Sequence, residues 1–302
     1  MGITAGTIRL LAQTVKKRSI SGNVVTLGVQ GVQAKYDELV HYLNAEDFEY
    51  KRISNDQIVI DNITQWKNTM HQGVLFKMLG FTNVESLDYF SDEKPTHIVD
   101  LNQSVVESLV NRYDLIYDGG TMEHCFDVRS VLANCVRMLK VGGVITHHVP
   151  MSGSIDHGFY QFSPTLFFDF YGENGFDEMN LKIHFMDGHD EYYIEHEYGK
   201  EKRLPNWFDY GSRYIFFTAK KRIAVSEIKI PIQNKYREIF GDKRNQGRVV
   251  NVKSKMKPHR KILKMLFPKK YDYIMEYEHF LLNRRRTKRR ISKLKKSSIA
   301  LT

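Results

Sequence analysis

Apolar and polar positions change their spacing in a regular order between residues 21 and 222. Short apolar or β-branched runs occupy positions 24–27, 84–90, 96–102, 113–118 and 142–150, and each has the length of a buried strand. Residues 69–81 and 127–143 instead carry apolar side chains at helical spacing, and Gly80 is the predicted stop of the first of these helices. Asp127 is the predicted cap of the second helix, and Gly142 and Gly143 are its predicted end.

This alternation predicts an α/β fold with a Rossmann-like, doubly wound, mostly parallel sheet covered on both faces. Residues 181–187 and 212–221 are predicted to close the sheet as an antiparallel pair. We expect the α/β domain to span residues 21–222, with three further segments around or inside it. These are a helix over 1–20, an insertion at about 35–66, and a basic, largely helical C-terminal extension over 223–302.

The composition narrows the class of protein. The chain has 302 residues, of which 42% are hydrophobic, as in a globular protein. No stretch approaches the roughly 18 apolar residues of a membrane span, and residues 1–17 lack the apolar core of a secretory signal. The two cysteines, Cys125 and Cys135, are too few for a disulfide framework and wrongly spaced for a zinc site. We therefore expect a cytoplasmic protein.

Histidine and acidic residues gather over residues 184–196, where a metal site has to be considered. Their spacing matches no strong ligand pattern, so the segment is interpreted as a solvated acidic loop. No metal site is predicted.

The net charge of +10 is unevenly distributed. Residues 242–302 hold 20 of the 45 Lys and Arg but 4 of the 35 Asp and Glu, so the basic character belongs to the tail. Tyr273, Ile274, Tyr277, Phe280 and Leu281 fall at helical spacing there. A basic amphipathic tail is compatible with peripheral binding to an anionic membrane at its inner face, with phosphate contacts to RNA, or with a solvated tail.

The residues that directly follow the predicted strands form the candidate ligand site, because the carboxyl ends of parallel strands meet at one edge. Two carboxylates on adjacent strands suit a nucleoside: one can accept both ribose hydroxyls, and the other lies near the adenine amino group. Asp at a strand end is also a common turn residue, and that alternative stays open for each of them. The candidates are Gly28, Gln30 and Gly31, then Asp88, then Asp100 and Leu101, then Asp118 and Gly119.

The first turn argues against a dinucleotide. A pyrophosphate calls for G-x-G-x-x-G at a helix start, whereas GVQGVQ at 28–33 has two of those glycines at the wrong spacing. A nucleoside without phosphate fits better, and S-adenosylmethionine, with its sulfonium and amino acid, is such a ligand.

The segments LGFTNVESLDYF, HIVDLN, YDLIYDGGTMEHCFD, LKVGGVITHHVP and DHGFYQFSPTLFFDFYGENGF resemble the class I S-adenosylmethionine-dependent methyltransferases. Within that class they are similar to a bacterial subgroup often associated with surface-polysaccharide biosynthesis. The resemblance implies that Gly28 lines the methionine part, Asp88 holds the ribose, Asp100 lies near the adenine, and Asp118 and Gly119 border the sulfonium. The chain departs from the class at TLGVQG, where an acidic residue and three spaced glycines are usual.

Methyl transfer from a sulfonium is an in-line displacement, so a hydroxyl acceptor must be aligned and must lose its proton. Histidine accepts protons near neutral pH, and His157 and His124 are the preferred candidates for this base. His147 and His148 are also candidates, but alternation along the strand predicts that one of them is a core residue.

Residues 154–164 form a predicted loop that can line a sugar or another polar ring. Tyr160 and Gln161 are the predicted acceptor-binding residues, and the alternative is a lid that packs on the sheet. The leading hypothesis is a cytoplasmic methyltransferase that O- or N-methylates a small or glycan-linked polar acceptor. The alternatives are an RNA methyltransferase that uses the basic tail, and a cofactor-binding or scaffolding relative without catalysis.

Overall fold

The structure, a computed structural model, describes residues 2–58, 60–61, 69–187, 190–199 and 211–240. The chain divides into two compact units, Met1–Lys200 with Gly211–Tyr236, and Glu201–Tyr210 with Arg237–Thr302. The basic tail over residues 242–302, for which a membrane, RNA or solvent was considered, lies outside the described residues. The last described element is α6, Asn234–Phe240. In the described part of the chain, no helix is both long and apolar enough to cross a bilayer.

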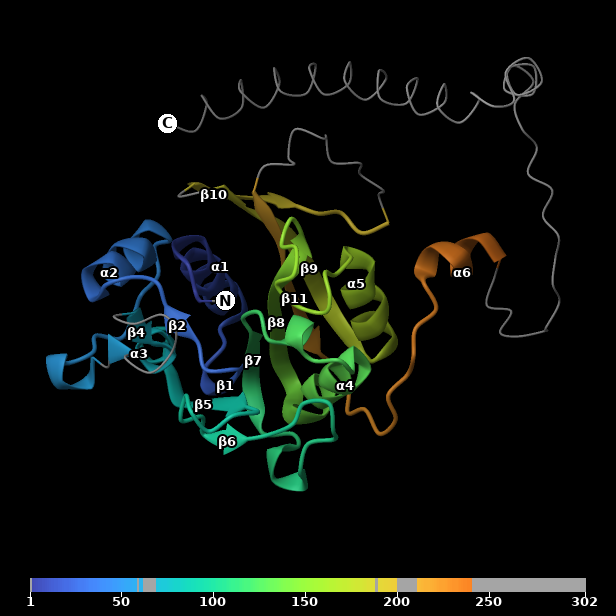
Figure 1. Cartoon of the computed structure of the whole chain (residues 1–302), viewed down its shortest axis with the longest axis horizontal. Coiled ribbons are helices and arrows are strands. Elements are labelled where there is room, and N and C mark those ends of the chain that lie inside the picture. Colours follow the sequence, from blue (N-terminus) through green and yellow to red (C-terminus); the bar gives the residue numbers. More distant parts are fainter. Residues whose placement is uncertain (1, 59, 62–68, 188–189, 200–210, 241–302) are drawn as a thin grey trace, which may run out of the picture. The chain divides into compact units, whose positions relative to one another are not determined.

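An eight-stranded sheet forms the centre of the first unit, with the order β10-β9-β11-β8-β7-β1-β5-β6 (Figure 1). β1 pairs in parallel with β5 and β7, while β11 pairs antiparallel with β8 and β9. The predicted Rossmann-like, mostly parallel sheet with an antiparallel closing pair is therefore confirmed. The strands are β1 Gly22–Leu27, β5 Phe81–Asp88, β6 His97–Ile98, β7 Tyr113–Asp118, β8 Leu139–Ser152, β9 Phe176–Asp187, β10 Asp190–Glu195 and β11 Ser212–Lys221.

Helices cover both faces of this sheet (Figure 1). On one face Tyr117 of β7 packs against Phe76 of α3, with ring centroids 5.8 Å apart. On the other face Phe217 of β11 stacks on Tyr171 of α5 at 5.5 Å. The helices are α1 Ala5–Arg18, α2 Tyr36–Ala45, α3 Gln72–Met78, α4 Val128–Met138 and α5 Pro164–Glu173, with short 3₁₀ turns η1 Asn55–Gln57, η2 Glu107–Leu109 and η3 Met122–His124.

The start of α4 follows its sequence signal, but its end does not. Asp127 accepts a hydrogen bond from the Ser130 backbone N–H at 3.1 Å, as predicted for the cap. The predicted stop at Gly142 and Gly143 is wrong, because the helix ends at Met138 and both glycines lie within β8. The register between β7 and β8 shifts beside them, and Gly142 takes a positive φ of 87°. The two glycines therefore allow the irregular start of β8 and do not end the helix.

The segment predicted as an insertion, at about 35–66, contains α2, η1 and β3. β3 belongs to a small second sheet with two strands that flank this segment, β2 Gly31–Val32 and β4 Thr69–His71. The strands are β2, β4 and β3 Ile60–Asp61, in the antiparallel order β2-β4-β3. The backbone of Ile3 bonds to Gly31 on one side and to Gln33 on the other, which ties the amino-terminal segment to β2. Ile8 of α1 and Leu39 of α2 share a hydrophobic core with Val24 of β1, so these segments pack with the main sheet.

A buried polar network fastens α1 to the far end of the sheet. His184 Nε2 lies 3.0 Å from Glu191 Oε2, and that oxygen accepts hydrogen bonds from Thr4 Oγ1 and the Gly6 N–H, both at 2.8 Å. His148 Nε2 lies 3.0 Å from His184 Nδ1. The interpretation of this segment as a solvated loop is therefore wrong for His184 and Glu191.

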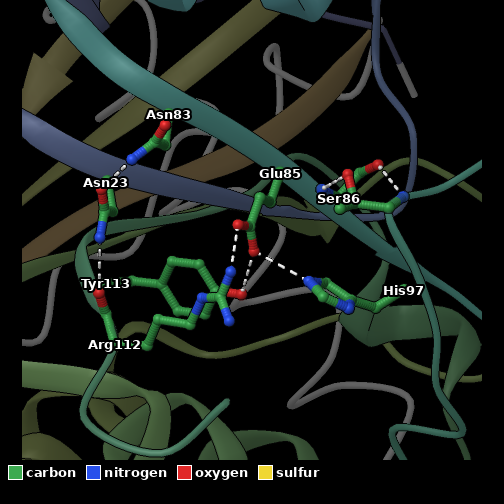
Figure 2. Close-up of polar contacts among 8 residues, drawn as sticks. Asn23, Asn83, Glu85, Ser86, His97, Arg112 and Tyr113 are labelled. Carbon is green, nitrogen blue, oxygen red and sulfur yellow. Dashed lines mark hydrogen bonds and ion pairs between the residues drawn. The ribbon is translucent and has the colours of Figure 1, made fainter. Parts of the chain in front are cut away.

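Glu85 of β5 is the centre of a second network, which joins three strands on the side away from their carboxyl ends (Figure 2). Its carboxylate accepts hydrogen bonds from Arg112 and, at 2.7 Å, from the Tyr113 hydroxyl, and it lies 2.8 Å from His97 Nε2. Burial acts to raise the pKa of Glu85, but the hydrogen bonds from these partners outweigh it and hold the pKa below its ordinary value.

We expect Glu85→Gln to lower the free energy of unfolding at pH 7 by about 1–2 kcal/mol, because Arg112 loses a charged acceptor. The folded-state pKa is depressed, so the carboxylate stabilises the protein above its unfolded pKa, and this contribution is lost as pH falls through the folded value. Urea unfolding at pH 7 and pH 3 measures the difference, with exposed Glu49→Gln as the control. A difference that persists unchanged at pH 3 contradicts the prediction.

Candidate active site

A cavity of about 460 Å³ lies at the carboxyl ends of β1, β5, β6 and β7, within the size range of small-ligand pockets. It is lined by residues 28–30, 87–90, 93, 99–102, 120–121 and 124–125. Of the predicted cofactor residues, the cavity brings together Gly28, Gln30, Asp88, Asp100 and Leu101. A wider hollow of about 640 Å³ lies beside the end of α1 and the loop after α2, away from these strand ends.

The turn after β1 requires glycine at position 28. Gly28 has a φ of 72°, and a Cβ there would lie 2.6 Å from Thr121 Oγ1. Thr121 Oγ1 itself donates to the Leu27 carbonyl at 2.7 Å, so the turns after β1 and β7 are joined. Any side chain at position 28 would push these two turns apart and would also fill the cavity wall.

Gln30 is held by its backbone and amide nitrogen while its amide oxygen stays unsatisfied. Its N–H donates to Gln72 Oε1 at 2.6 Å, and its Nε2 donates to the Leu27 carbonyl at 2.9 Å. Its Oε1 is buried and has no hydrogen-bond partner among the described residues. This oxygen lies toward Gly119, where a Cβ would be 2.7 Å from it.

The start of α3 lies beside this turn but offers no cradle for a phosphate. The Gln72 N–H donates to the Gln30 carbonyl at 3.2 Å, and the Gly73 N–H donates to His71 Nδ1 at 3.1 Å. The first amides of the helix are therefore occupied by the chain itself. The cavity lining contains Asp88, Glu93 and Asp100 but no Lys or Arg, so its charge also disfavours a pyrophosphate.

Asp88 and Asp100 each stabilise a local turn and still face the cavity. Asp88 accepts from the backbone N–H groups of Phe90, at 3.2 Å, and Val29, at 3.4 Å. Asp100 Oδ1 accepts from both the N–H and the side-chain amide of Asn102 at 2.9 Å, which leaves Oδ2 for a ligand. The turn interpretation and the ligand interpretation are thus compatible at both positions.

Two exposed aromatic rings stand next to Asp88, and the sequence reasoning missed them. Tyr89 is 59% exposed and Phe90 64% exposed, although both line the cavity. Together with buried Leu101 they form an apolar wall near the two carboxylates. The signal in the sequence is the pair of aromatic residues directly after a strand, where turn residues are usual.

Asp118 lies beneath the cavity floor and does not line it. Its Oδ2 is 2.8 Å from His147 Nδ1, whose Nε2 is 2.6 Å from the Tyr171 hydroxyl, and all three side chains are buried. Its Oδ1 accepts from the Thr121 N–H at 3.0 Å and from the Met122 N–H at 3.3 Å. The expectation that Asp118 borders a bound sulfonium is therefore corrected: its carboxylate is used inside the protein.

The two glycines expected in the site also lie off the cavity. Gly119 packs under Gln30, since a Cβ there would lie 2.7 Å from Gln30 Oε1. Gly31 belongs to β2 and pairs with His71 of β4. Both are close to the site, but they support neighbouring turns rather than face the cavity.

His124 and His157, predicted as alternatives, lie together over a buried glutamate. Their ring centroids are 5.0 Å apart, and Glu123 Oε1 lies 3.5 Å from His157 Nε2 and 3.9 Å from His124 Nε2. The loop is fixed here because the Phe159 N–H donates to the Glu123 carbonyl at 2.8 Å. His124 also lines the cavity, so this cluster marks the end of the cavity over β7.

Burial sets the protonation of this cluster. Burial, with the charge of Asp118 second, raises the pKa of Glu123 to about 8. Burial and the neighbouring His157 lower the pKa of His124, and burial also lowers the pKa of His157. Both imidazoles are therefore mainly neutral near pH 7 and can accept a proton. Burial raises the pKa of the nearby Cys125 thiol to about 12, which disfavours a nucleophilic role.

Tyr160 and Gln161 brace the loop and do not line the cavity. The Tyr160 hydroxyl donates to the Phe126 carbonyl at 2.9 Å, and Gln161 Oε1 accepts from the Ser154 N–H at 3.5 Å. Beside them, Phe126 and Phe159 make an edge-to-face contact at 5.8 Å while they stay 73% and 66% exposed. His157 therefore contacts Glu123 and His124, while Phe126 and Phe159 remain open to solvent.

His147 and His148 are both core residues, on opposite faces of β8.

No protein-family model matches the chain, and no curated protein matches it. Similar solved structures include a methyltransferase from Thermotoga maritima, described as S-adenosylmethionine-dependent and a possible histamine N-methyltransferase. It shares 15% identity with this chain, the match covers 72% of this chain and 91% of the other, and the TM-score is 0.36. An S-adenosylmethionine-dependent methyltransferase from Archaeoglobus fulgidus shares 14% identity over 71% and 94%, with a TM-score of 0.37.

A third similar structure is 1,6-didemethyltoxoflavin-N1-methyltransferase from Burkholderia thailandensis, with bound 1,6-didemethyltoxoflavin and S-adenosylhomocysteine. It shares 10% identity over 72% of this chain and 78% of its own, with a TM-score of 0.33. These likenesses assign no role to any residue of this chain.

We expect Gly28→Ala to lower the free energy of unfolding by more than the about 1–2 kcal/mol that a positive φ costs a residue with a Cβ, because Thr121 must also move. Gly80→Ala is the matched control, since Gly80 has a φ of 97° but open space around its Cβ position. Urea unfolding measures both variants. Equal losses in the two would show that the close approach of Thr121 has no energetic weight.

Proposed function

We propose that the protein binds S-adenosylmethionine in the cavity at the carboxyl ends of β1, β5, β6 and β7, and transfers its methyl group to a polar acceptor. The observation that carries this proposal is the lining itself: carboxylates at the ends of two adjacent strands, two aromatic rings beside them, and no Lys or Arg. A cofactor with hydroxyls, amino groups and a sulfonium matches these groups, whereas a phosphate does not.

Each part of the cofactor would contact the lining residues at a different strand end. Asp88 would accept the ribose hydroxyls, and Asp100 Oδ2 would accept from the adenine amino group. Tyr89, Phe90 and Leu101 would contact the adenine ring, which is planar and apolar on its faces. The methionine part would lie against Gln30, and Gly28 would allow its close approach to the backbone.

The methyl group would then lie at the end of the cavity that His124 lines. In the transfer, a lone pair of the acceptor oxygen or nitrogen forms the bond to the methyl carbon. The electron pair of the S–C bond returns to sulfur, and S-adenosylhomocysteine leaves as a neutral thioether. A neutral imidazole of His124 or His157 can take the acceptor proton, because the pKa of each is lowered by burial.

We propose a small or glycan-linked acceptor for this reaction, in keeping with the predicted role in polysaccharide biosynthesis. The open pair Phe126 and Phe159 stands beside the cluster and offers ring faces against which a sugar or another ring can pack. Tyr160 and Gln161 would act by holding this loop in place, since their polar groups are bonded within it.

Asp88→Asn tests the cofactor assignment. We expect calorimetry to show S-adenosylmethionine binding to the full chain and a loss of roughly 100-fold in the variant, because hydrogen bonds to a charged group contribute about 1.5–3 kcal/mol each. Asparagine keeps one oxygen for the turn with Phe90, so the fold should persist. Exposed Asp92→Asn, in the same loop but not in the lining, is the matched control. Unchanged affinity in Asp88→Asn contradicts the assignment.

Transfer of labelled methyl groups from S-adenosylmethionine to separate pools of small metabolites, glycans and RNA tests the reaction. We expect label in the small-molecule or glycan pool, and loss of that label in Asp88→Asn. Label in RNA alone would support the tail-dependent alternative. Tight cofactor binding with no label in any pool would support a non-catalytic relative.

A further inference from the structure

Glu123, His124 and His157 form a cluster at the β7 end of the cavity. Proton transfer by the two histidines does not explain why Glu123 is buried there. Glu123 is fully buried, and neither of its carboxylate oxygens has a hydrogen-bond partner among the described residues. A buried carboxyl group without partners is costly, and in native proteins it calls for a specific cause such as an ion. Its Oε1 is directed at two imidazole nitrogens that come from different segments of the chain.

We propose that Glu123, His124 and His157 form a binding site for a divalent transition-metal cation. One ligand atom from each residue lies within 4.8 Å of the other two. Glu123 Oε1 lies 3.5 Å from His157 Nε2 and 3.9 Å from His124 Nε2. Ligand atoms about 2.1 Å from an ion lie about 3.0 Å apart in octahedral and about 3.4 Å apart in tetrahedral geometry. Small rotations of the two part-exposed histidines would bring the nitrogens to those distances.

The ligand set favours one group of metals. Two imidazoles and one carboxylate suit Zn²⁺, Fe²⁺, Co²⁺ or Ni²⁺, whereas Mg²⁺ and Ca²⁺ prefer oxygen ligands. Three protein ligands leave open positions on the ion, as in catalytic rather than structural sites. His124 and His157 keep 46% and 35% of their side chains exposed, so water or an acceptor can reach those positions.

A cation here would also offset the charges beneath it. Asp118 lies buried under the same turn and donates no proton to Glu123, since its oxygens accept from His147, Thr121 and Met122. An ionised Glu123 would be repelled by an ionised Asp118. A divalent ion bound to Glu123 would offset this repulsion.

The consequence for the reaction rests on the proposed function, while ion binding itself does not. An imidazole nitrogen that ligates the ion cannot also accept the acceptor proton. The acceptor hydroxyl would instead occupy an open position on the ion, which lowers its pKa so that its proton leaves to water. The resulting alkoxide attacks the methyl carbon, and the S–C electron pair returns to sulfur. Acceptors with oxygen atoms able to ligate an ion are therefore favoured.

Titration of the chelator-treated full chain with Co²⁺, followed by visible absorption, tests the site with the metal alone. We expect Glu123→Gln and His157→Ala each to weaken binding of one equivalent of Co²⁺ by at least roughly tenfold, the equivalent of about 1.4 kcal/mol. The exposed controls Glu107→Gln and His41→Ala should bind as the unaltered chain does. Zn²⁺ should displace the bound Co²⁺, and a similar excess of Mg²⁺ should not.

Unaltered Co²⁺ binding in both cluster variants overturns the proposal and leaves Glu123 as a buried neutral acid. Displacement by Mg²⁺ as effective as by Zn²⁺ overturns the choice of metal. If Glu123→Gln does not fold, His157→Ala decides alone, because His157 is part-exposed. Calorimetry with S-adenosylmethionine on the same variants separates the two proposals: metal binding without cofactor binding contradicts the function, and cofactor binding without metal binding contradicts the site.

Discussion

The buried carboxylate of Asp118 fixes the turn from which both halves of the site are built. It ends β7, accepts hydrogen bonds from the N–H groups of Thr121 and Met122, and is held from below by His147. Loss of a partner would leave a buried polar group unsatisfied, which costs about 1–3 kcal/mol, so this arrangement has little freedom to change. The turn it fixes brings Thr121 to the Leu27 carbonyl at the end of β1 and leads directly into Glu123 and His124.

The same turn couples the proposed cofactor end of the cavity to its proposed acceptor end. On one side Thr121 limits the space over Gly28, where a Cβ would be 2.6 Å from its hydroxyl. On the other side η3 carries Glu123, whose backbone carbonyl holds the loop of His157 through the Phe159 N–H. Ligand affinity at one end and acceptor geometry at the other therefore depend on one short segment. The charge of Asp118 also reaches Glu123, where it adds to the effect of burial on the pKa.

The sequence predicted the fold class and the mostly parallel sheet, because these depend on local patterns. A β-branched run followed by Gly or Asp marks a strand end, and Gly28, Asp88 and Asp100, which were selected in this way, line the cavity. The same pattern was misleading at Asp118, and the position of β7 in the sheet explains why. β5 and β6 lie at one side of the sheet, where a terminal carboxylate meets the cavity, whereas β7 lies between β1 and β8, and Asp118 is directly opposite His147 of β8. The side chain of Asp118 therefore meets His147 instead of a ligand.

Other features depend on contacts between distant segments and could not be predicted from spacing. His124 and His157 were separate candidates in the sequence, and only the folded loop places them against one glutamate. Glu123 lies four residues before Asp127, the cap of α4, and the fold buries its side chain completely. The helical spacing continues to Leu139, so the sequence predicts a helix end at Gly142 and Gly143. In the structure Leu139 is already the first residue of β8, where it pairs with Tyr113.

The departure of the first turn from the glycine-rich pattern has a physical explanation in the small second sheet. After Gly28 the chain does not enter a helix; it enters β2, and α3 starts only after β4 returns to the same place. Gln30 replaces the missing helix start: its backbone bonds to Gln72 on both sides, and its Nε2 closes the turn on Leu27. The amides that a phosphate-binding turn would present are thus used within the chain, at the Gln30 N–H and at the start of α3. Because the lining also carries Asp88, Glu93 and Asp100 and no Lys or Arg, a phosphate would meet like charge there, so the altered turn disfavours a dinucleotide.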